Sequence, residues 1–278
     1  MRVVEEQAIK KKVAEFWDLA PCGSFASHVQ PGELEFFVEV ERYREANQSF
    51  VRHLVDFRRF AGLGMLEVGC GLGTDLLCAA SLGANTVGMD LSLRSAGLAR
   101  RHFQLKRMPG DFLRADAERL PYKDGSFDVV YSFGVLHHTT DTQAAINECR
   151  RVLKPGGTLV LMLYNRTSWY VHVEPYLVSL KRLMLRQPTL VGGMDKTEVI
   201  RRHDGAGNPL GKAYSPSEIK EMLSGFERTK LAIRHPRVVN GGRVATAYGR
   251  LMEWSGITSR WGFWIIAQSV KPTQTAVT

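Results

Sequence analysis

A glycine-rich stretch over residues 67–75, EVGCGLGTD, is the part of the chain best suited to chemistry. Glycine lets a backbone turn tightly and lets a ligand approach it closely, because it has no Cβ. A loop that binds a nicotinamide dinucleotide has the spacing GxGxxG, whose third glycine allows a helix to pack closely on a strand. Here Thr74 takes that third position, the spacing is GxGxG, and Glu67 stands just before the loop. These differences favour a ligand other than a pyrophosphate.

Two acidic residues stand where the next strands are expected to end. Asp90 lies about twenty residues beyond the glycine loop, where a carboxylate can accept hydrogen bonds from both hydroxyls of a ribose. Its alternative role is to cap the helix that follows. Asp116 comes directly after a short strand expected over 112–115. It is either a ligand-binding residue or a residue that forms a turn.

Two adjacent histidines, His137 and His138, follow the strand expected over 127–132. Ligands of open α/β sheets bind at the carboxyl ends of the strands, so these side chains are expected near a site. An unperturbed imidazole titrates near about pH 6.5, which suits a general base. His138 is therefore the first catalytic candidate and His137 the second. The alternative is that both histidines only shape the loop.

The elements that position these residues alternate regularly from about residue 64 to residue 164. Apolar runs predict strands over 64–68, 85–90, 112–115, 127–132 and 158–164. Segments with helical periodicity predict helices over 74–82, 92–106 and 141–153, with Ser92 as the N-cap of the second. Strands that are apolar on both faces and alternate with helices predict a parallel sheet covered on both sides.

The flanking segments do not follow this alternation. Residues 1–60 are expected to be helical, and 165–213 form an insertion. Within it, Pro175 to Arg186 reads as an amphipathic helix with Pro175 in its first turn. A further helix is expected to open at Ser215 and end near Gly225, and two late strands are expected over 229–234 and 264–270. The segment 238–260 is expected to be helix and loop.

The chain resembles the class I S-adenosylmethionine-dependent methyltransferases that act on small molecules. The resemblance rests on four features in the expected order, namely the loop that begins at Glu67, Asp90, Asp116 and the stretch from Asp128 to His138. The resemblance is close over residues 60–165 and looser near Gly225 and Trp264. It implies an α/β, Rossmann-like, doubly wound fold with a mostly parallel seven-stranded sheet, an antiparallel late strand and helices on both faces. It also implies a helical cap over 1–60, a methyltransferase domain over 61–278 and a lid insertion at about 165–213.

The implied cofactor is S-adenosyl-L-methionine, which leaves as S-adenosyl-L-homocysteine. By resemblance, Asp90 holds the ribose, Asp116 meets the adenine amino group beside the Ala117 backbone, and Leu91 lies against the adenine ring. Backbone near Gly69 and Phe133 would hold the methionine part. Tyr43 or Arg44 either meets the cofactor carboxylate or lies on a solvated helix face. The residues expected to bind the cofactor are Glu67, Gly69, Cys70, Gly71, Gly73, Thr74, Asp75, Asp90, Leu91, Ser92, Asp116, Ala117, Glu118, Phe133, Tyr43 and Arg44.

The acceptor pocket is expected just past the fifth strand, and the residues expected to line it are Tyr164, Asn165, Trp169, Tyr170 and His172. The aromatic residues among them could instead only pack the lid. The chain has SFGV over 132–135, not a (D/N)PP(Y/F) tetrapeptide, which argues against methylation of exocyclic amino groups. The expected acceptor is a small, largely apolar metabolite that is lipid-, quinone-, polyketide- or sugar-like. An RNA or other nucleic-acid methyltransferase and a non-catalytic nucleotide-binding regulator are the alternatives.

Composition narrows these possibilities further. The chain of 278 residues has 37 Lys and Arg against 28 Asp and Glu, a net charge of +9, in short groups without interleaved aromatics. This pattern favours a solvated face over a nucleic-acid partner. The basic amphipathic helix could contact a membrane surface. The sequence predicts no metal site and a monomer or homodimer. It also predicts a cytoplasmic location, because it contains neither a membrane-spanning apolar run nor a signal peptide.

Overall fold

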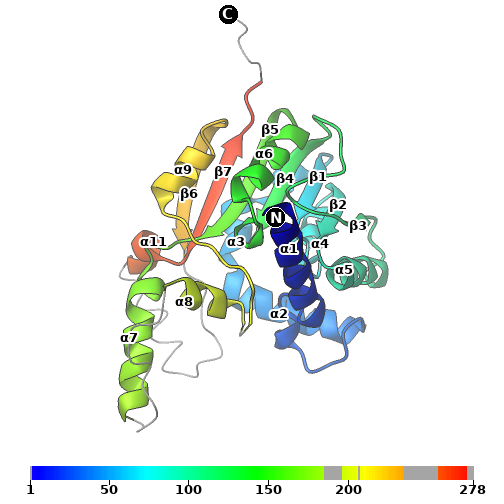
Figure 1. The fold of residues 1–278 in the computed structure, drawn as a ribbon. Helices are drawn as coiled ribbons and strands as arrows, with labels where there is room; N and C mark the ends of the chain where they lie inside the picture. The colour runs from blue at the N-terminus through cyan, green and yellow to red at the C-terminus, as the bar shows by residue number, and fades with distance from the viewer. Residues whose placement is uncertain (1, 185–195, 206, 235–255, 274–278) are drawn as a thin grey trace, which may run out of the picture.

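A single seven-stranded sheet carries the functional loops. The computed structural model describes residues 2–184, 196–205, 207–234 and 256–273. The strand order is β3-β2-β1-β4-β5-β7-β6 (Figure 1). β7 is antiparallel to both of its neighbours, β5 and β6, and the other neighbouring strands pair in parallel. The strands are β1 (Gly64–Val68), β2 (Asn85–Asp90), β3 (Asp111–Arg114), β4 (Phe127–Phe133), β5 (Leu153–Tyr164), β6 (Glu227–Arg234) and β7 (Trp264–Val270).

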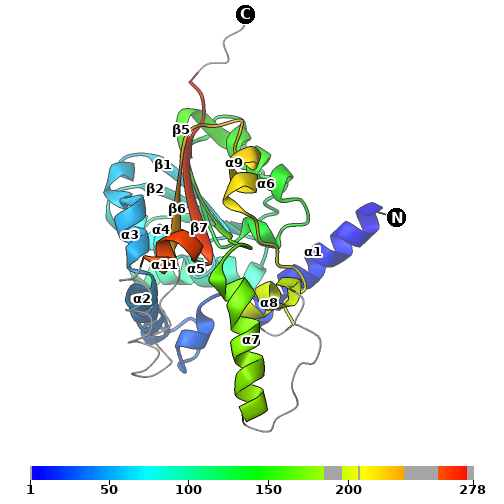
Figure 2. The same ribbon diagram turned by 90° about the vertical axis from the view of Figure 1, so that its left-hand side faces the viewer.

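Helices cover both faces of this sheet (Figure 2). α3, α4 and α5 pack on one face, whereas α6 and α9 pack on the other. The expected Rossmann-like, doubly wound fold is therefore confirmed. The helices are α1 (Arg2–Leu19), α2 (Leu34–Gln48), α3 (Phe50–Val55), α4 (Thr74–Ser81), α5 (Leu93–Leu105), α6 (Thr142–Val152), α7 (Trp169–Met184), α8 (Lys196–His203), α9 (Pro216–Met222) and α11 (Ile257–Trp261).

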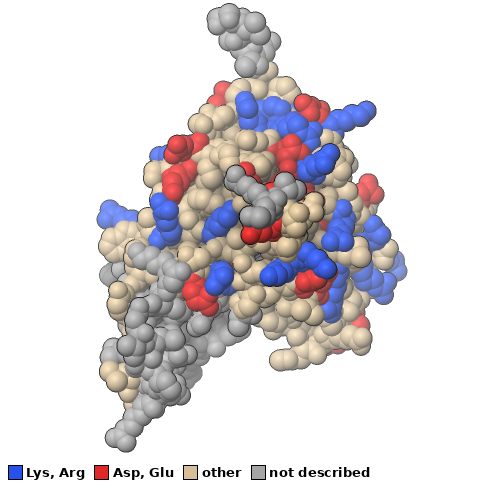
Figure 3. Space-filling view, viewed as in Figure 1, with Lys and Arg blue, Asp and Glu red and all other residues tan. Residues whose placement is uncertain are grey.

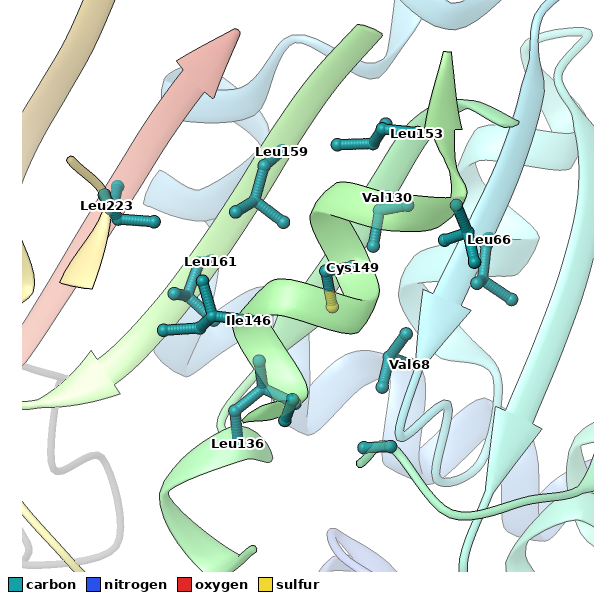
Figure 4. Close-up of a cluster of buried hydrophobic side chains, with 14 of the residues drawn as sticks. Leu66, Val68, Val130, Leu136, Ile146, Cys149, Leu153, Leu159, Leu161 and Leu223 are labelled. Atoms are coloured by element: carbon teal, nitrogen blue, oxygen red, sulfur yellow. The ribbon is translucent and has the colours of Figure 1, made fainter. Parts of the chain in front are cut away.

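Apolar side chains pack between α6 and the sheet (Figure 4). Ile146 and Cys149 of α6 lie against Leu66 of β1 and Leu161 of β5 in one buried cluster. The neighbouring Met65 belongs to the cluster on the opposite face. Because successive strand residues point to opposite faces, a strand buried on both sides must be apolar at nearly every position. This requirement explains why β1 was recognisable from its sequence.

Side-chain caps set where the helices begin. Ser92 Oγ accepts from the Ser95 amide at 2.9 Å, so the predicted cap of α5 is confirmed. Asp141 Oδ1 accepts from the Ala144 amide at 2.9 Å in the same way and begins α6. Ser215 begins α9 with a capping box, in which the Glu218 carboxylate also accepts from the Ser215 amide. Each cap pairs an amide that lacks a partner within its helix.

Two boundaries differ from the sequence predictions. β5 begins at Leu153 rather than at residue 158, because Leu153 already pairs with Phe127 before an irregularity in the register of β4. α7 begins at Trp169, where Ser168 Oγ accepts from the Val171 amide at 3.4 Å. Pro175 consequently lies inside α7, so its prediction as a first-turn residue was wrong. Of the segment 238–260, only 256–260 lies within the described residues, and Ile257 to Arg260 are helical.

The N-terminal helices share their packing with the sheet layers. Phe36, Phe37 and Val40 of α2 form a buried cluster with Leu72 of the glycine loop. Residues of α3 join the same core as Met65 of β1. We propose that residues 1–60 form a cap and residues 61–278 the methyltransferase domain. The cap packs into the core of that domain.

Candidate active site

A cavity of about 680 Å³ opens at the carboxyl ends of the parallel strands. Its walls include Glu67 near the end of β1, Asp90 at the end of β2, Phe133 at the end of β4 and Tyr164 at the end of β5. Residues of α1 and α2 line it from the other side. Because several strand ends line the cavity, it lies where open α/β sheets bind ligands. The N-terminal helices therefore contribute to the walls of the site.

The glycine loop turns from β1 into α4 beneath this cavity. The Gly69 and Cys70 amides donate to the Met89 carbonyl at 2.8 and 2.9 Å, which ties the loop to β2. Gly69 has φ +76°, and a Cβ there would overlap the side chain of Val135. Gly71 has φ +53°, lines the cavity, and a Cβ there would meet no atom within 4 Å. Gly69 is thus required for packing, whereas Gly71 leaves space for a ligand.

Asp90 is fixed at the wall of the cavity by backbone amides. Its Oδ2 accepts from the Gly71 amide and its Oδ1 from the Ser92 amide, both at 2.9 Å. Burial raises the pKa of Asp90 to about 6, although these amides favour the charged form. A carboxylate oxygen has two lone pairs, so each oxygen can still accept one further hydrogen bond. This is the geometry that two adjacent ribose hydroxyls need.

Glu67 presents an unpaired oxygen to the same space. It is 4% exposed, and no described residue forms a hydrogen bond with its Oε2. Burial, followed by the nearby charge of Asp75, raises the pKa of Glu67 well above its usual range. A buried acceptor without a partner is costly, so such atoms are normally satisfied by water or a ligand. A donor carrying positive charge would satisfy this carboxylate best.

Arg44 is held over the cavity by Asp75. Its Nε donates to Asp75 Oδ1 at 2.9 Å, and its Nη2 donates to Asp75 Oδ2. Tyr131 also donates to Asp75 Oδ2, at 2.6 Å. Within the described part of the chain, Nη1 of Arg44 makes no hydrogen bond, and the guanidinium lies 5.6 Å from the centre of the Phe133 ring. Asp75 therefore orients Arg44, which lines the cavity together with Tyr43.

Asp116 lies in a turn and also bonds to α1. Its Oδ1 accepts from the Glu118 amide at 2.9 Å, and its Oδ2 accepts from Lys10 Nζ at 2.7 Å. Lys10 also pairs with Glu118 at 2.7 Å. The turn-forming role considered from the sequence is thus present, and the side chain still lines the cavity. A ligand that bonds to Asp116 would share this carboxylate with Lys10.

One wall of the cavity, here named the far end, is polar and is lined by His138, Tyr164 and Asp204. Nδ1 of His138 lies 2.5 Å from the Leu210 carbonyl, which can only accept, so this nitrogen carries a proton. Nε2 of His138 lies 3.4 Å from Asp204 Oδ2. Tyr164 donates to the other oxygen of Asp204, Oδ1, at 2.5 Å. His138, Tyr164 and Asp204 thus meet at one wall.

The structure brings most of the predicted cofactor residues together around the cavity. The predicted cofactor residues on its walls are Glu67, Gly69, Cys70, Gly71, Thr74, Asp75, Asp90, Leu91, Asp116, Ala117, Glu118, Phe133, Tyr43 and Arg44. Gly73 and Ser92 lie outside this lining and cap α4 and α5. Their predicted contacts with the cofactor would therefore be indirect.

The predicted acceptor and catalytic residues are more scattered. Asn165 is buried and donates to the Gly262 carbonyl at 2.8 Å, so it serves the fold. Trp169 and Tyr170 are half-buried, and His172 is exposed; none of these three lines the cavity. His137 is fully buried beneath Tyr164, with ring centres 3.8 Å apart, and burial lowers its pKa well below the usual range.

Several cavity residues were missed from the sequence. Lys10 and Trp17 come from α1, and Cys22 comes from the loop after it. His203 is the last residue of α8, and Asp204 follows it directly. The run HDGAGNP over 203–209 was the available signal, because an acidic residue among turn-forming glycines is unusual in a helical insertion. No pattern in the sequence connected it with the histidines.

Comparison with known proteins agrees with this geometry. Residues 66–161 match the family described as a methyltransferase domain. A ubiquinone biosynthesis O-methyltransferase from Rhodopseudomonas palustris (strain HaA2) is 31% identical over 78% of this chain and 76% of its own length. The chain belongs to the class I S-adenosylmethionine-dependent methyltransferases. The methyltransferases of this family use S-adenosyl-L-methionine as the methyl donor.

This chain covers a smaller share of the length of other relatives. A ubiquinone biosynthesis O-methyltransferase from Cereibacter sphaeroides (strain ATCC 17025) is 34% identical over 55% of this methyltransferase and 60% of the relative. Among solved structures, magnesium protoporphyrin IX methyltransferase from Synechocystis PCC 6803 with bound SAH has a TM-score of 0.54. It is 18% identical and covers 95% of this chain and 99% of that one. The [4+2]-cyclase SpnF has a TM-score of 0.53 at 17% identity, covering 94% of this chain and 96% of that one. These two structural matches share the fold.

The cavity residues fit the donor. The unpaired oxygen of Glu67 can meet a positive charge, Asp90 can accept from a ribose, and the open side of Gly71 leaves room for the ligand. Across the described ranges, no helix has both the length and the apolar character needed to cross a lipid bilayer. The predicted contact of α7 with a membrane surface stays a prediction, as does its role in a lid.

Proposed function

We propose that this methyltransferase transfers a methyl group to a hydroxyl oxygen of a small, largely apolar, quinone-like acceptor. The observation that carries the proposal is the composition of one continuous cavity. Its donor end contains Glu67 and Asp90, and its far end contains His138, Tyr164 and Asp204. The relatives named as ubiquinone biosynthesis O-methyltransferases support an acceptor of this class.

At the donor end, we assign the ribose to Asp90 and the adenine to the wall formed by Leu91, Asp116 and Ala117. Glu67 and the loop around Gly69 would face the methionine part, with Arg44 Nη1 available for its carboxylate. A guanidinium bonds a carboxylate strongly, and here Asp75 already fixes its orientation. All of these residues line the same cavity.

When bound, S-adenosyl-L-methionine supplies a methyl group on a sulfonium, which is already a good leaving group. The protein must therefore hold the acceptor oxygen in line with that methyl, at about 3 Å, in a site from which water is excluded. α1 supports this exclusion because Lys10, Val13 and Trp17 line the cavity on the side opposite the sheet. Positioning by the walls, rather than a covalent step on the protein, is what this geometry provides.

The middle of the cavity is suited to an apolar acceptor. Phe133, Met162 and Trp264 line it from the ends of β4, β5 and β7, and Trp17 lines it from α1. Flat aromatic walls favour a ring of similar shape. The polar wall at Tyr164 and Asp204 can bond to a hydroxyl group on that ring, and the Asp204 carboxylate can accept the proton that this hydroxyl loses on methylation. A ring carrying a hydroxyl group satisfies both parts of the cavity.

The charge on the surface gives less support to a nucleic-acid acceptor. In Figure 3, Lys and Arg side chains lie in separate groups, with Asp and Glu side chains between them. Lys10, which reaches the cavity, is paired with two acidic residues, Asp116 and Glu118. A surface that binds the phosphate backbone needs cations free to replace counterions along a continuous path.

The test is transfer of a labelled methyl group from S-adenosyl-L-methionine to a panel of acceptors. The panel contains alkyl- or prenyl-substituted catechols and hydroquinones, matched compounds whose hydroxyls are already methylated, and an RNA extract. The proposal predicts labelled product from the free hydroxyl compounds and none from the blocked ones. Transfer only to RNA, or equal transfer to blocked and free compounds, would contradict it. The Asp90→Ala variant controls for label transferred outside this site.

A further inference from the structure

We propose that His137, His138 and Asp204 form a binding site for a divalent transition-metal ion at the acceptor end of the cavity. Each residue offers one ligand atom, and these atoms lie within 4.8 Å of one another. Two imidazoles and a carboxylate are a ligand set that suits Zn²⁺, Fe²⁺ or Co²⁺. The sequence predicted no metal here because the third ligand is far from the other two along the chain.

Two hydrogen-bond acceptors lie close together in this cluster. The Leu210 carbonyl accepts a hydrogen bond from Nδ1–H of His138, so Nε2 of the neutral ring carries a lone pair. Asp204 Oδ2 lies 3.4 Å from that nitrogen. Two acceptors this close repel each other unless a cation lies between them. The cation can be a proton on Nε2 or a metal ion, and these alternatives differ in what they require of a third residue.

His137 is that third residue. Its ring is fully buried, and neither of its nitrogens has a hydrogen-bond partner among the residues that the structure describes. It packs against His138 with ring centres 4.3 Å apart and against Tyr164 with ring centres 3.8 Å apart. A proton shared by His138 and Asp204 would leave both nitrogens of His137 unsatisfied, which is costly for a buried polar group. A metal ion would take one of them as a ligand.

The surrounding bonds are those expected around a metal. Histidine ligands usually donate their second N–H to a carbonyl or carboxylate, as His138 does to Leu210. Ligating carboxylates are themselves hydrogen-bonded, and Asp204 accepts from Tyr164 at 2.5 Å and from Asn208 Nδ2 at 3.4 Å. The ligands come from the 3₁₀ turn η3 (Leu136–His138) and from the residue after α8, so separate parts of the fold converge on the cluster.

Three protein ligands leave at least one position of a four-coordinate ion open. Because His138 and Asp204 line the cavity, that position can face an acceptor's oxygen. His138 is then a metal ligand and does not serve as the predicted general base. Contact between the ion and the acceptor rests on the proposed function, whereas binding of the ion does not.

The experiment is a titration of chelator-treated full-length protein with Co²⁺, read by its visible absorption, followed by displacement with Zn²⁺. A Cys22→Ser background prevents a thiol in the cavity from contributing. We expect saturation at one ion per chain. His137→Gln and Asp204→Asn should each weaken binding by at least about tenfold, since even residues that only support a ligand cost this much. His53→Ala, which removes an exposed histidine of α3, is the matched control and should bind normally.

Binding of S-adenosyl-L-homocysteine checks that each variant is folded and is independent of the metal. A protein that binds this product but shows no Co²⁺ spectrum contradicts the metal site and leaves the proposed methyl transfer intact. Equal Co²⁺ titrations for the parent, His137→Gln and Asp204→Asn also contradict it. If a variant does not fold, the unfolding temperature of the parent is measured with and without Zn²⁺. The proposal predicts a higher temperature with Zn²⁺, because a bound ion stabilises only the folded chain. No rise counts against the proposal.

Discussion

The Gly71 amide donates to Asp90 Oδ2 at 2.9 Å and thereby joins the loop after β1 to the end of β2. Gly71 leaves space for the donor, and Asp90 is assigned to its ribose. This hydrogen bond therefore holds the two residues together. The Ser92 amide holds the other carboxylate oxygen. Asp90 needs no rearrangement before it accepts hydroxyl groups, which lowers the entropic cost of binding.

Removing the Asp90 carboxylate should weaken donor binding strongly. The Asp90→Ala change deletes two charge-assisted hydrogen bonds to the ribose, each worth about 1.5–3 kcal/mol. We expect the affinity for S-adenosyl-L-homocysteine, measured by calorimetry, to fall by about a hundredfold or more. Asp111→Ala removes an exposed carboxylate of β3 outside the cavity lining and should bind like the parent. Equal affinity of both variants would refute the role of Asp90.

Donor binding should depend on pH through the same group. The pKa of Asp90 is raised to about 6, mainly by burial. Below that pH the carboxyl is mostly protonated and can no longer accept at both oxygens. Affinity for S-adenosyl-L-homocysteine should therefore rise with pH through about 6 and level off above it. Asp90→Asn has no such proton, so a profile unchanged by this substitution would show that another group is responsible.

A Cβ at Gly69 should destabilise the fold at the loop. Alanine there must adopt φ +76° and would overlap Val135. Gly62 has the same φ of +76°, but a Cβ there meets no atom within 4 Å. Gly62→Ala should cost only the backbone strain of about 1–2 kcal/mol, whereas Gly69→Ala should cost about 1–3 kcal/mol more. Denaturant unfolding measures both, and equal losses would mean that the Val135 contact is relaxed at no cost.

The pair of Arg44 and Asp75 should be coupled. Arg44→Ala leaves the carboxylate of Asp75, which is only 10% exposed, without its cationic partner. Such a loss typically costs about 3–5 kcal/mol, and we expect the lower end because Tyr131 still donates to Asp75. The double variant Arg44→Ala with Asp75→Asn should recover part of this stability. Strictly additive losses in a double-mutant cycle would argue against the pair.

The sheet was predictable from sequence because its core strands are apolar on both faces. β2 and β7 were predicted with the same bounds, and the cap at Ser92 follows from one hydroxyl before a helix. Positions that depend on distant contacts were less accessible. The start of β5 depends on its pairing with Phe127, and the start of α7 depends on a cap at Ser168 that outweighs the preference of Pro175 for a first turn.

The same distinction between local and distant contacts applies to the candidate site. The donor end follows the strand ends, so Glu67, Gly71 and Asp90 were predicted together from their spacing. The far end is assembled by tertiary contacts, since Asp204 reaches His138 across a separation of 66 positions in the numbering (204 − 138). Periodicity carries no information about such a meeting. Sequence reasoning therefore selected His172 and Asn165, which follow β5 but do not line the cavity.

A crystal structure of this methyltransferase with S-adenosyl-L-homocysteine tests the central claim most directly. The account predicts both ribose hydroxyls within about 3.2 Å of the Asp90 carboxylate and the adenine between Leu91 and Asp116. It also predicts that the sulfur faces the part of the cavity that leads to Tyr164 and Asp204. A nucleoside bound elsewhere, or a sulfur separated from that wall by protein, would contradict a single cavity shared by donor and acceptor.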